Sequence, residues 1–318
     1  MLTLYLVVPC YNEEEIIECS ARTLLKKMDE LVENRLILVD SKIVFVNDGS
    51  KDKTFEILSS LCRNEDRCVL ISFTKNFGHQ NAILAGMMFS REFADAVITI
   101  DADLQQDIQA IGEFLSAYEK GCDVVYGVRK DRDSDGLFKK ASANLFYGLM
   151  RLLGCDVLAN SADYRLMSRK ALETLSEYSE ANLFLRGLIP LMGFRSDIVY
   201  FDVKPREGGK SKYSLKKMIT LAIDGITSLS IKPIRFVTFL GLGMCLFAVF
   251  MIIFSIYTWI HEGAVPGYTT TVISTWLVGG AILLSEGIIG EYIGKMYFET
   301  KKRPRYIIDS VIYGEKKT

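Results

Sequence analysis

The chain has 318 residues, a formal net charge of −1 and 49% hydrophobic residues, so it is long enough for two domains. Without a bulk positive field, nucleic acid is not an expected partner, and the basic residues that matter must act locally. The seven cysteines show no CxxC spacing, which argues against a zinc site or a disulfide framework and favours a reducing compartment. The two histidines, His79 and His261, leave little material for histidine-based catalysis.

Residues up to about 232 alternate short β-branched runs with longer segments of helical spacing. This alternation predicts βαβ units around a mostly parallel sheet, and hence an α/β fold. The expected strands span residues 4–8, 43–46, 69–73, 97–100, 124–126 and 198–203. The expected helices span residues 13–31, 53–61, 80–89 and 108–119.

Polar residues follow several of these strands, at the edge of a parallel sheet where ligands usually bind. They occupy residues 9–13, 47–50, 101–105 and 127–129. Three of these clusters also have a plain structural interpretation: Asn12 as the N-cap of a helix, residues 47–50 as a turn, and Arg129 as a surface arginine. The sequence contains neither GxGxxG nor GxxxxGK[ST], which argues against dinucleotide and P-loop sites.

The segment Asp101-Ala102-Asp103-Leu104-Gln105 is the most informative of these clusters. Two carboxylates one residue apart at the end of a buried strand are costly unless a cation compensates them. A divalent metal that bridges to a substrate diphosphate is such a cation, because Mg²⁺ is typically held by one or two carboxylates and phosphate oxygens. The alternative is a solvated turn with two incidental aspartates.

Two long apolar segments follow the α/β region. No charged residue occurs between residues 236 and 260, a length that suffices for one membrane crossing. The second segment, residues 272–293, carries Glu286 and Glu291, and Glu286 is expected to be paired or to face protein. A buried helical hairpin in a soluble protein is the alternative to a membrane hairpin.

Basic residues flank this pair of segments, whereas the linker 261–268 between them has no Lys or Arg. The positive-inside rule then predicts a multi-pass protein of the inner or plasma membrane, with the large N-terminal part and both termini in the cytoplasm. Small residues on the second segment predict helix–helix packing and allow a homo-oligomer. These small residues are Gly287, Gly290 and Gly294, and the basic residues are Lys210, Lys212, Lys216, Lys217, Lys232, Arg235, Lys295, Lys301, Lys302, Arg303 and Arg305.

Six segments, in this order, resemble glycosyltransferase family 2: residues 7–13, 45–50, 75–78, 101–105, 163–166 and 206–212. Within that family the chain resembles the polyprenyl-phosphate glycosyltransferases, which include dolichyl-phosphate mannose synthases and bacterial bactoprenol glucosyltransferases. The paired C-terminal apolar segments match as well, so the resemblance covers nearly the whole chain. It departs at Asn47, where the family often has Asp, and at residues 106–108, where the family often has Asp-Pro-Pro.

The resemblance implies a GT-A fold, a Rossmann-like and mostly parallel sheet, in a cytoplasmic catalytic domain of residues 1–212. Residues 213–232 are expected to form an interfacial amphipathic helix, with a packed surface helix as the alternative. Residues 233–295 are expected to form a two-helix transmembrane hairpin, and residues 296–318 a cytoplasmic tail. The bilayer is therefore an expected partner.

The resemblance also assigns roles to residues. It implies a metal site for Mg²⁺ or Mn²⁺ and a basic pair that grips phosphate near the membrane. Asp163 has three open interpretations: it orients the acceptor or sugar, caps a helix entry, or forms an ion pair with Arg165. The implied nucleoside pocket is Pro9, Tyr11, Glu13, Val46 and Asp48. The implied metal site is Asp101, Asp103 and Gln105, with the small Ala102 beside the nucleotide. Arg129 is implied to contact the donor diphosphate, and the implied basic pair is Arg206 and Lys212.

The expected reaction is transfer of a sugar from a nucleotide-sugar donor to polyprenyl phosphate with inversion at C1. UDP-glucose or UDP-N-acetylglucosamine is the expected donor, and modification of cell-envelope glycans the expected purpose. One alternative is a processive polysaccharide synthase, although such synthases usually carry a Gln-x-x-Arg-Trp motif, and both tryptophans here, Trp259 and Trp276, lie in the apolar region. The other is a non-catalytic membrane partner that binds nucleotide.

Overall fold

A computed structural model describes residues 1–130, 161–180, 184–202 and 267–314, with single residues between 234 and 257. Four of the expectations above fall outside these residues. They are the roles of Arg206 and Lys212, the amphipathic helix 213–232, and most of the first apolar segment. Every described residue from 237 to 257 in that apolar segment is helical.

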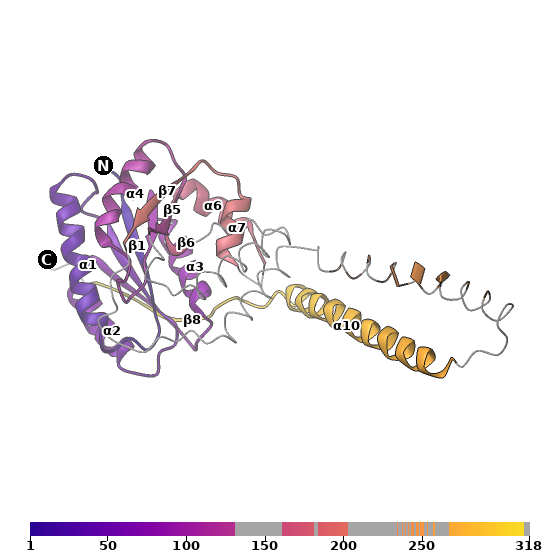
Figure 1. Cartoon of the computed structure of the whole chain (residues 1–318). Coiled ribbons are helices and arrows are strands. Elements are labelled where there is room, and N and C mark those ends of the chain that lie inside the picture. The colour runs from indigo at the N-terminus through magenta and orange to yellow at the C-terminus, as the bar shows by residue number, and fades with distance from the viewer. Residues whose placement is uncertain are drawn as a thin grey trace.

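The described part is built on an eight-stranded mixed sheet in the order β7-β5-β6-β4-β1-β2-β3-β8 (Figure 1). Four central strands run parallel, with β1 between β4 and β2 and with β3 beyond β2. Their sequences are apolar at nearly every position because both faces of the sheet are covered. These strands are β1 (Leu4–Cys10), β2 (Lys42–Asn47), β3 (Cys68–Phe73) and β4 (Ala96–Thr99), each within two residues of its predicted bounds.

Helices pack on both faces of the sheet and form two separate hydrophobic cores. One core contains apolar side chains of α1 (Ile17–Glu33), α2 (Thr54–Asn64) and α4 (Ile111–Glu119), the last preceded by the 3₁₀ turn η1 (Ile108–Ala110). The other contains side chains of α3 (His79–Ser90), α6 (Arg169–Glu177) and α7 (Leu185–Leu191). The predicted α/β class is therefore confirmed for the described residues.

Strand β6 (Ser161–Ser168) lies between β4 and β5 (Val124–Arg129) and runs antiparallel to both. The sequence did not predict it, because its Asp163 and Arg165 interrupt the apolar pattern of a buried strand. Both side chains are nevertheless buried and paired with each other. Beyond β5, the parallel edge strand β7 (Ser196–Phe201) completes this half of the sheet.

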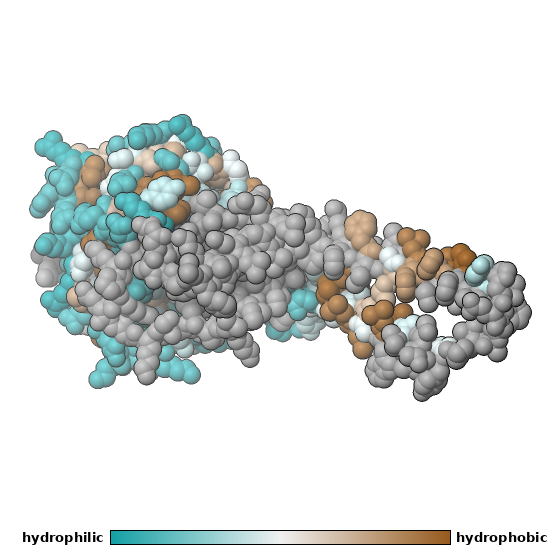
Figure 2. All heavy atoms as spheres, in the orientation of Figure 1, coloured by the Kyte–Doolittle hydropathy of each residue, from teal (hydrophilic) through white to brown (hydrophobic). Residues whose placement is uncertain are grey.

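A 33-residue helix, α10 (Tyr268–Thr300), projects away from the sheet (Figure 1). Its stretch Leu277–Tyr297 is long and apolar enough to cross a membrane, and is the one such span among the described residues. Apolar side chains gather along this arm, whereas the visible described surface of the α/β body is mainly hydrophilic (Figure 2). Of the two predicted membrane spans, the described residues thus support the second.

After α10 the chain returns to the sheet as β8 (Ile308–Tyr313), which pairs antiparallel with β3. The sequence predicted a cytoplasmic tail for residues 296–318, but residues 296–300 continue α10 and residues 308–313 form an edge strand of the sheet. The Tyr306 ring stacks on Phe73 with centroids 5.2 Å apart, and Arg305 donates a 2.6 Å hydrogen bond to the Tyr178 carbonyl. The long apolar helix is therefore anchored to the body at its C-terminal end.

Candidate active site

The parallel strands β1, β2 and β4 end at one edge of the sheet, which brings three of the predicted clusters together. Two hydrogen bonds join the first two clusters: the Asp48 backbone N–H donates to the Cys10 carbonyl over 2.9 Å, and the Asn12 backbone N–H donates to Ser50 Oγ over 3.0 Å. Asn12 has a φ of 53°, a left-handed conformation that asparagine tolerates. Its side chain accepts from the Lys51 N–H, and α1 begins only at Ile17, so the N-cap interpretation of Asn12 is wrong.

Asp48 holds the next loop in place. Its two carboxylate oxygens accept backbone hydrogen bonds from Phe77 over 2.6 Å and Gly78 over 3.0 Å. Burial raises the pKa of Asp48 above its ordinary value, although these two hydrogen bonds act in the opposite direction. A carboxylate has about four acceptor positions, so Asp48 retains capacity for a further donor such as a base edge.

Asp101 and Asp103 occupy a tight turn directly after β4. Leu104 has a φ of 45°, and its N–H donates to the Asp101 carbonyl over 3.2 Å. The Asp103 side chain accepts from the Gln105 backbone N–H over 3.3 Å. The Asp101 carboxylate accepts a hydrogen bond from the amide of Gln106, a residue that sequence reasoning did not single out.

The charges around Asp101 fit a divalent cation. Burial raises the pKa of Asp101, and the charges of Asp163 and Asp103 raise it further, while His79 and the Gln106 amide oppose them. Negative charge at this turn is thus under-compensated, and a cation would relieve it. Within the described ranges no group of three or more His, Cys, Asp or Glu side chains is arranged to hold a metal. Asp101 and Asp103 would therefore share a metal with oxygens of the substrate, as Mg²⁺ commonly requires.

Asp163 is the centre of a buried ion cluster beside this turn. Arg165 Nη2 lies 2.7 Å from Asp163 Oδ1, while Arg186 reaches Oδ1 through Nε at 3.1 Å and Oδ2 through Nη2 at 2.8 Å. Burial opposes ionisation of Asp163, but the charges of Arg186 and Arg165 and a hydrogen bond from His79 outweigh it and hold its pKa well below the usual range. Of the open interpretations of Asp163, the ion pair with Arg165 is present. The helix-entry cap is not, because Asp163 lies inside β6.

His79, the first residue of α3, connects the two groups of carboxylates. Its Nε2 lies 3.5 Å from Asp101 Oδ1 and 3.6 Å from Asp163 Oδ2. Partial desolvation acts to lower the pKa of His79, but Asp163 and Asp101 outweigh it and raise that pKa above its ordinary value. The scarcity of histidine led sequence reasoning to discount this residue. The signal that could have found it is its place directly after the segment 75–78.

The remaining predicted site residues divide by burial. Pro9 and Val46 are direct partners in the β1–β2 register and are buried, as is Ala102. Tyr11, Glu13 and Gln105 are half-buried, and the Glu13 N–H donates to Thr54 Oγ1 over 2.9 Å. Arg129 is the exposed last residue of β5, a strand that ends at the same edge as β4 because both run antiparallel to β6. Arg186, by contrast, was not predicted.

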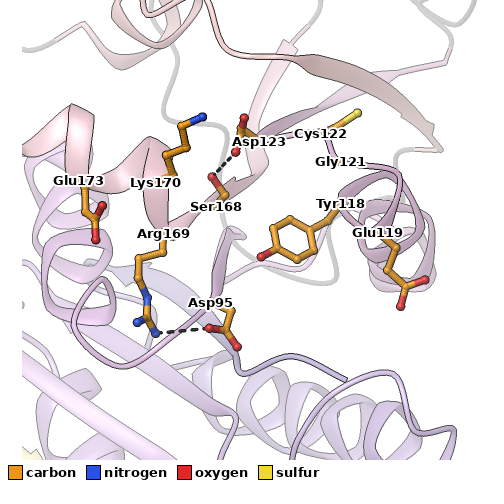
Figure 3. Close-up of a pocket in the computed structure, with 10 residues that line it drawn as sticks. All are labelled: Asp95, Tyr118, Glu119, Gly121, Cys122, Asp123, Ser168, Arg169, Lys170 and Glu173. Atoms are coloured by element: carbon orange, nitrogen blue, oxygen red, sulfur yellow. Dashed lines mark hydrogen bonds and ion pairs between the residues drawn. The ribbon is translucent and has the colours of Figure 1, made fainter.

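A separate cavity of about 590 Å³ lies at the opposite edge of the sheet, where β4 and β5 begin (Figure 3). Its lining includes Asp95, Asp123, Ser168 and Arg169, none of which the sequence singled out. Arg169 pairs with Asp95 at 3.4 Å, and Ser168 Oγ lies 2.9 Å from Asp123 Oδ1. The cavity and the predicted site are thus at different ends of the sheet.

The model of the family "Glycosyl transferase family 2" matches residues 5–176, a span that contains Asp48, Asp101, Asp103 and Asp163. The uncharacterized glycosyltransferase YkoT of Bacillus subtilis (strain 168) is 45% identical to this chain, over 98% of this chain and 93% of its own length. The bactoprenol glucosyl transferase of Shigella phage SfX is 38% identical, over 96% and 98%. Among solved structures, glucosyl-3-phosphoglycerate synthase from Mycobacterium tuberculosis, in complex with Mn²⁺, UDP-glucose and phosphoglyceric acid, aligns over 72% of this chain and 78% of that chain, with 18% identity and a TM-score of 0.44.

The chain therefore belongs to glycosyltransferase family 2 and is a glycosyltransferase. The expected family is confirmed, and with it the coarse fold, a mixed α/β sheet of the GT-A kind.

Proposed function

We propose that this glycosyltransferase moves a sugar from a nucleotide-sugar donor to polyprenyl phosphate. The observation that carries the proposal is the carboxylate turn Asp101–Asp103 at the sheet edge of a chain that is 38% identical, over nearly its whole length, to a bactoprenol glucosyl transferase. UDP-glucose or UDP-N-acetylglucosamine is the proposed donor. The lipid-linked sugar would serve modification of cell-envelope glycans.

Asp101 and Asp103 are the proposed ligands of Mg²⁺ or Mn²⁺, with Gln105 beside them. When bound, the metal would act as a Lewis acid and template for the donor diphosphate. Ala102, small and buried between the carboxylates, leaves room for the nucleotide to lie close to the backbone. Pro9, Tyr11, Glu13, Val46 and Asp48 are proposed to form the nucleoside pocket.

The acceptor needs little activation, because a lipid phosphate is already an anion at neutral pH and can attack the sugar C1 directly. Such an attack from the side opposite the leaving diphosphate inverts C1. The harder task is to bring two anionic substrates together. Preorganised cations at developing phosphate charge supply this kind of stabilisation, and Arg129, Arg206 and Lys212 are the proposed cations.

We further propose that the enzyme acts at the cytoplasmic face of the inner or plasma membrane. Support comes from the apolar length of α10 and from the basic residues that follow it in the sequence. The proposed topology has two crossings, with the catalytic domain and both termini in the cytoplasm, and α10 as the second crossing. The glycines of α10 would pack against a neighbouring helix in this chain or in a second copy.

The test uses full-length protein in membranes, a panel of labelled nucleotide sugars and undecaprenyl phosphate, with the lipid product identified by mass. We expect a product whose mass equals undecaprenyl phosphate plus one hexose or one N-acetylhexosamine. A polymer of many sugars would favour a processive synthase. No transfer from any donor, despite nucleotide binding, would favour a non-catalytic partner.

A further inference from the structure

The ion cluster on β6 contains an arginine, Arg186, to which the proposed function has given no role. It combines one carboxylate, Asp163, with two guanidinium groups, Arg165 and Arg186. The Asp163 and Arg165 side chains are only 7% and 2% exposed, so this pair lies in the interior, where direct contact between opposite charges offsets their removal from water.

Arg186 is the member of this cluster that reaches the surface. Its side chain is 28% exposed, compared with 2% for Arg165. Arg186 binds the carboxylate of Asp163, which also lies close to His79. His79 in turn contacts Asp101 of the proposed metal turn. Three successive side-chain contacts, through Asp163 and His79, therefore link Arg186 to Asp101 of the proposed metal turn.

The position of Arg186 is fixed by two independent contacts. Asp163 binds two of its guanidinium nitrogens, which sets the plane of the group. The preceding residue, Leu185, donates its backbone N–H to Gln80 Oε1 over 3.0 Å, which fastens the start of α7 to the start of α3. A guanidinium held in this way loses little further conformational entropy when it binds an anion. Its planar arrangement of N–H donors also suits phosphate oxygens.

The same contacts argue against Asp163 as a proton acceptor in the reaction. Oδ1 is engaged by Arg165 and Arg186, and Oδ2 by Arg186 with His79 nearby. A proton that moved to this carboxylate would disrupt the pairing of two guanidinium groups. The geometry of Asp163 instead suits a carboxylate that stays ionised and orients the two arginine side chains.

We propose that Arg186 binds a phosphate group of a substrate, and that Asp163 is the positioning residue that aims it. The inference rests on the proposed function, because that function supplies two phosphate-bearing substrates. The shared chemistry is a phosphate oxyanion, which belongs either to the donor diphosphate or to the lipid phosphate of the acceptor.

The test measures binding to detergent-solubilised full-length protein by calorimetry, with UDP-glucose in one arm and undecaprenyl phosphate in the other. We expect Arg186→Gln to weaken one of the two ligands by about tenfold or more, since charge-assisted bidentate contacts are among the strong ones. The arm that weakens identifies the phosphate. Arg186→Lys should recover part of the loss by restoring the charge. Arg169→Gln, which removes an exposed arginine at the opposite edge of the sheet, is the matched control and should bind both ligands as the wild type does.

Asp163→Asn separates positioning from mere support of the fold. It should weaken binding of the same ligand as Arg186→Gln does. The double variant should lose little more affinity than Arg186→Gln alone, because each substitution disrupts the same contact between Arg186 and the phosphate. Unchanged affinity for both ligands in Arg186→Gln overturns the inference, as does an additive loss in the double variant. Binding needs no turnover, so these outcomes are distinct from failure of the proposed function, which is a wild-type protein that transfers no sugar to undecaprenyl phosphate.

Discussion

Strand β6 carries polar side chains at both of its ends, and therefore on the two opposite sides of the sheet where strands begin and end. Near its start, Asp163 and Arg165 are buried and share partners with His79 and Arg186. At its end, Ser168 caps α6 by accepting the Ala171 N–H over 3.1 Å and pairs with Asp123 beside the cavity of Figure 3. The polar side chains at the two ends of β6 thus serve different purposes.

The ion pairs make the difference concrete. Arg169 and Asp95, at the cavity edge, are each 44% exposed, and pairs of that kind contribute little to stability. Asp163, at the other edge, is 7% exposed and is shared by two arginines. The cavity thus lies where the ion pairs are exposed to solvent, and the candidate active site lies where the charged groups are buried and shared. Buried, shared charge is the better guide to chemistry in this molecule.

The largest effect that this comparison predicts is on the turn after β4. Asp103→Asn should reduce sugar transfer by roughly 10²–10³-fold, because it removes a charge aimed at the metal and the donor diphosphate. The measurement is the initial rate of lipid product formation, with folding checked by the thermal unfolding midpoint. Asp123→Asn at the opposite edge should retain transfer within about twofold. Equal rates for Asp103→Asn and the wild type would refute the assignment of the turn.

A second prediction concerns the helix that carries His79. A Cβ added at Gly86 in α3 would lie 2.3 Å from Val7 Cγ1 and 3.0 Å from Val46 Cγ2, so the helix cannot keep its distance from the sheet. Gly86→Ala should lower the free energy of unfolding by about 1–3 kcal/mol, as overpacked cores do. Gly112→Ala in α4, where nothing lies within 4 Å of the added atom, should be neutral or stabilise by up to about 1 kcal/mol. Equal stability of the two variants, measured by denaturant unfolding in detergent, would contradict this packing.

A third prediction concerns the loop held by Asp48. In Asp48→Asn, one carboxylate oxygen becomes an NH₂ group that faces a backbone N–H of Phe77 or Gly78. One buried donor is then unsatisfied, at a cost of about 1–3 kcal/mol in the free energy of unfolding. Asp197→Asn, on the exposed edge strand β7, is the control and should leave stability unchanged. The account of this loop fails if the two variants unfold at the same denaturant concentration.

The last prediction concerns the edge of the sheet formed by β8. Tyr306→Ala removes the ring that stacks on Phe73 and should lower the free energy of unfolding by about 0.5–1.5 kcal/mol beyond the lost burial. Tyr200→Ala, at a 52% exposed position on the other edge strand, should change it by less than about 0.5 kcal/mol. A larger loss in Tyr200→Ala than in Tyr306→Ala would mean that the segment before β8 is not anchored as described.

The sequence was a good guide to the parallel half of the sheet. For example, every position of β1 is buried, and its continuous apolar sequence indicates this burial directly. It was a poor guide to β6, whose buried Asp163 and Arg165 look like surface residues until their pairing in space is known. It also missed β8, whose exposed outer positions resemble a polar tail and whose partner, β3, lies more than two hundred residues earlier in the chain.

The same limit applies to the site. The carboxylate turn and Asp48 follow strands, so their place at one sheet edge could be predicted from the chain alone. The contacts of His79 and Arg186 could not, because these side chains reach Asp163 from two other elements, α3 and α7. The number of histidines gave no indication of these contacts, which depend on the position of His79 at the start of α3.

The central claim is that Asp101 and Asp103 form a metal–diphosphate site, and the affinity for UDP with and without Mg²⁺ tests it most directly. We expect Mg²⁺ to strengthen UDP binding by about tenfold or more in the wild type and to have little effect in Asp103→Asn. UDP binding that is indifferent to Mg²⁺ and Mn²⁺ in the wild type, and equal in the variant, would contradict the claim.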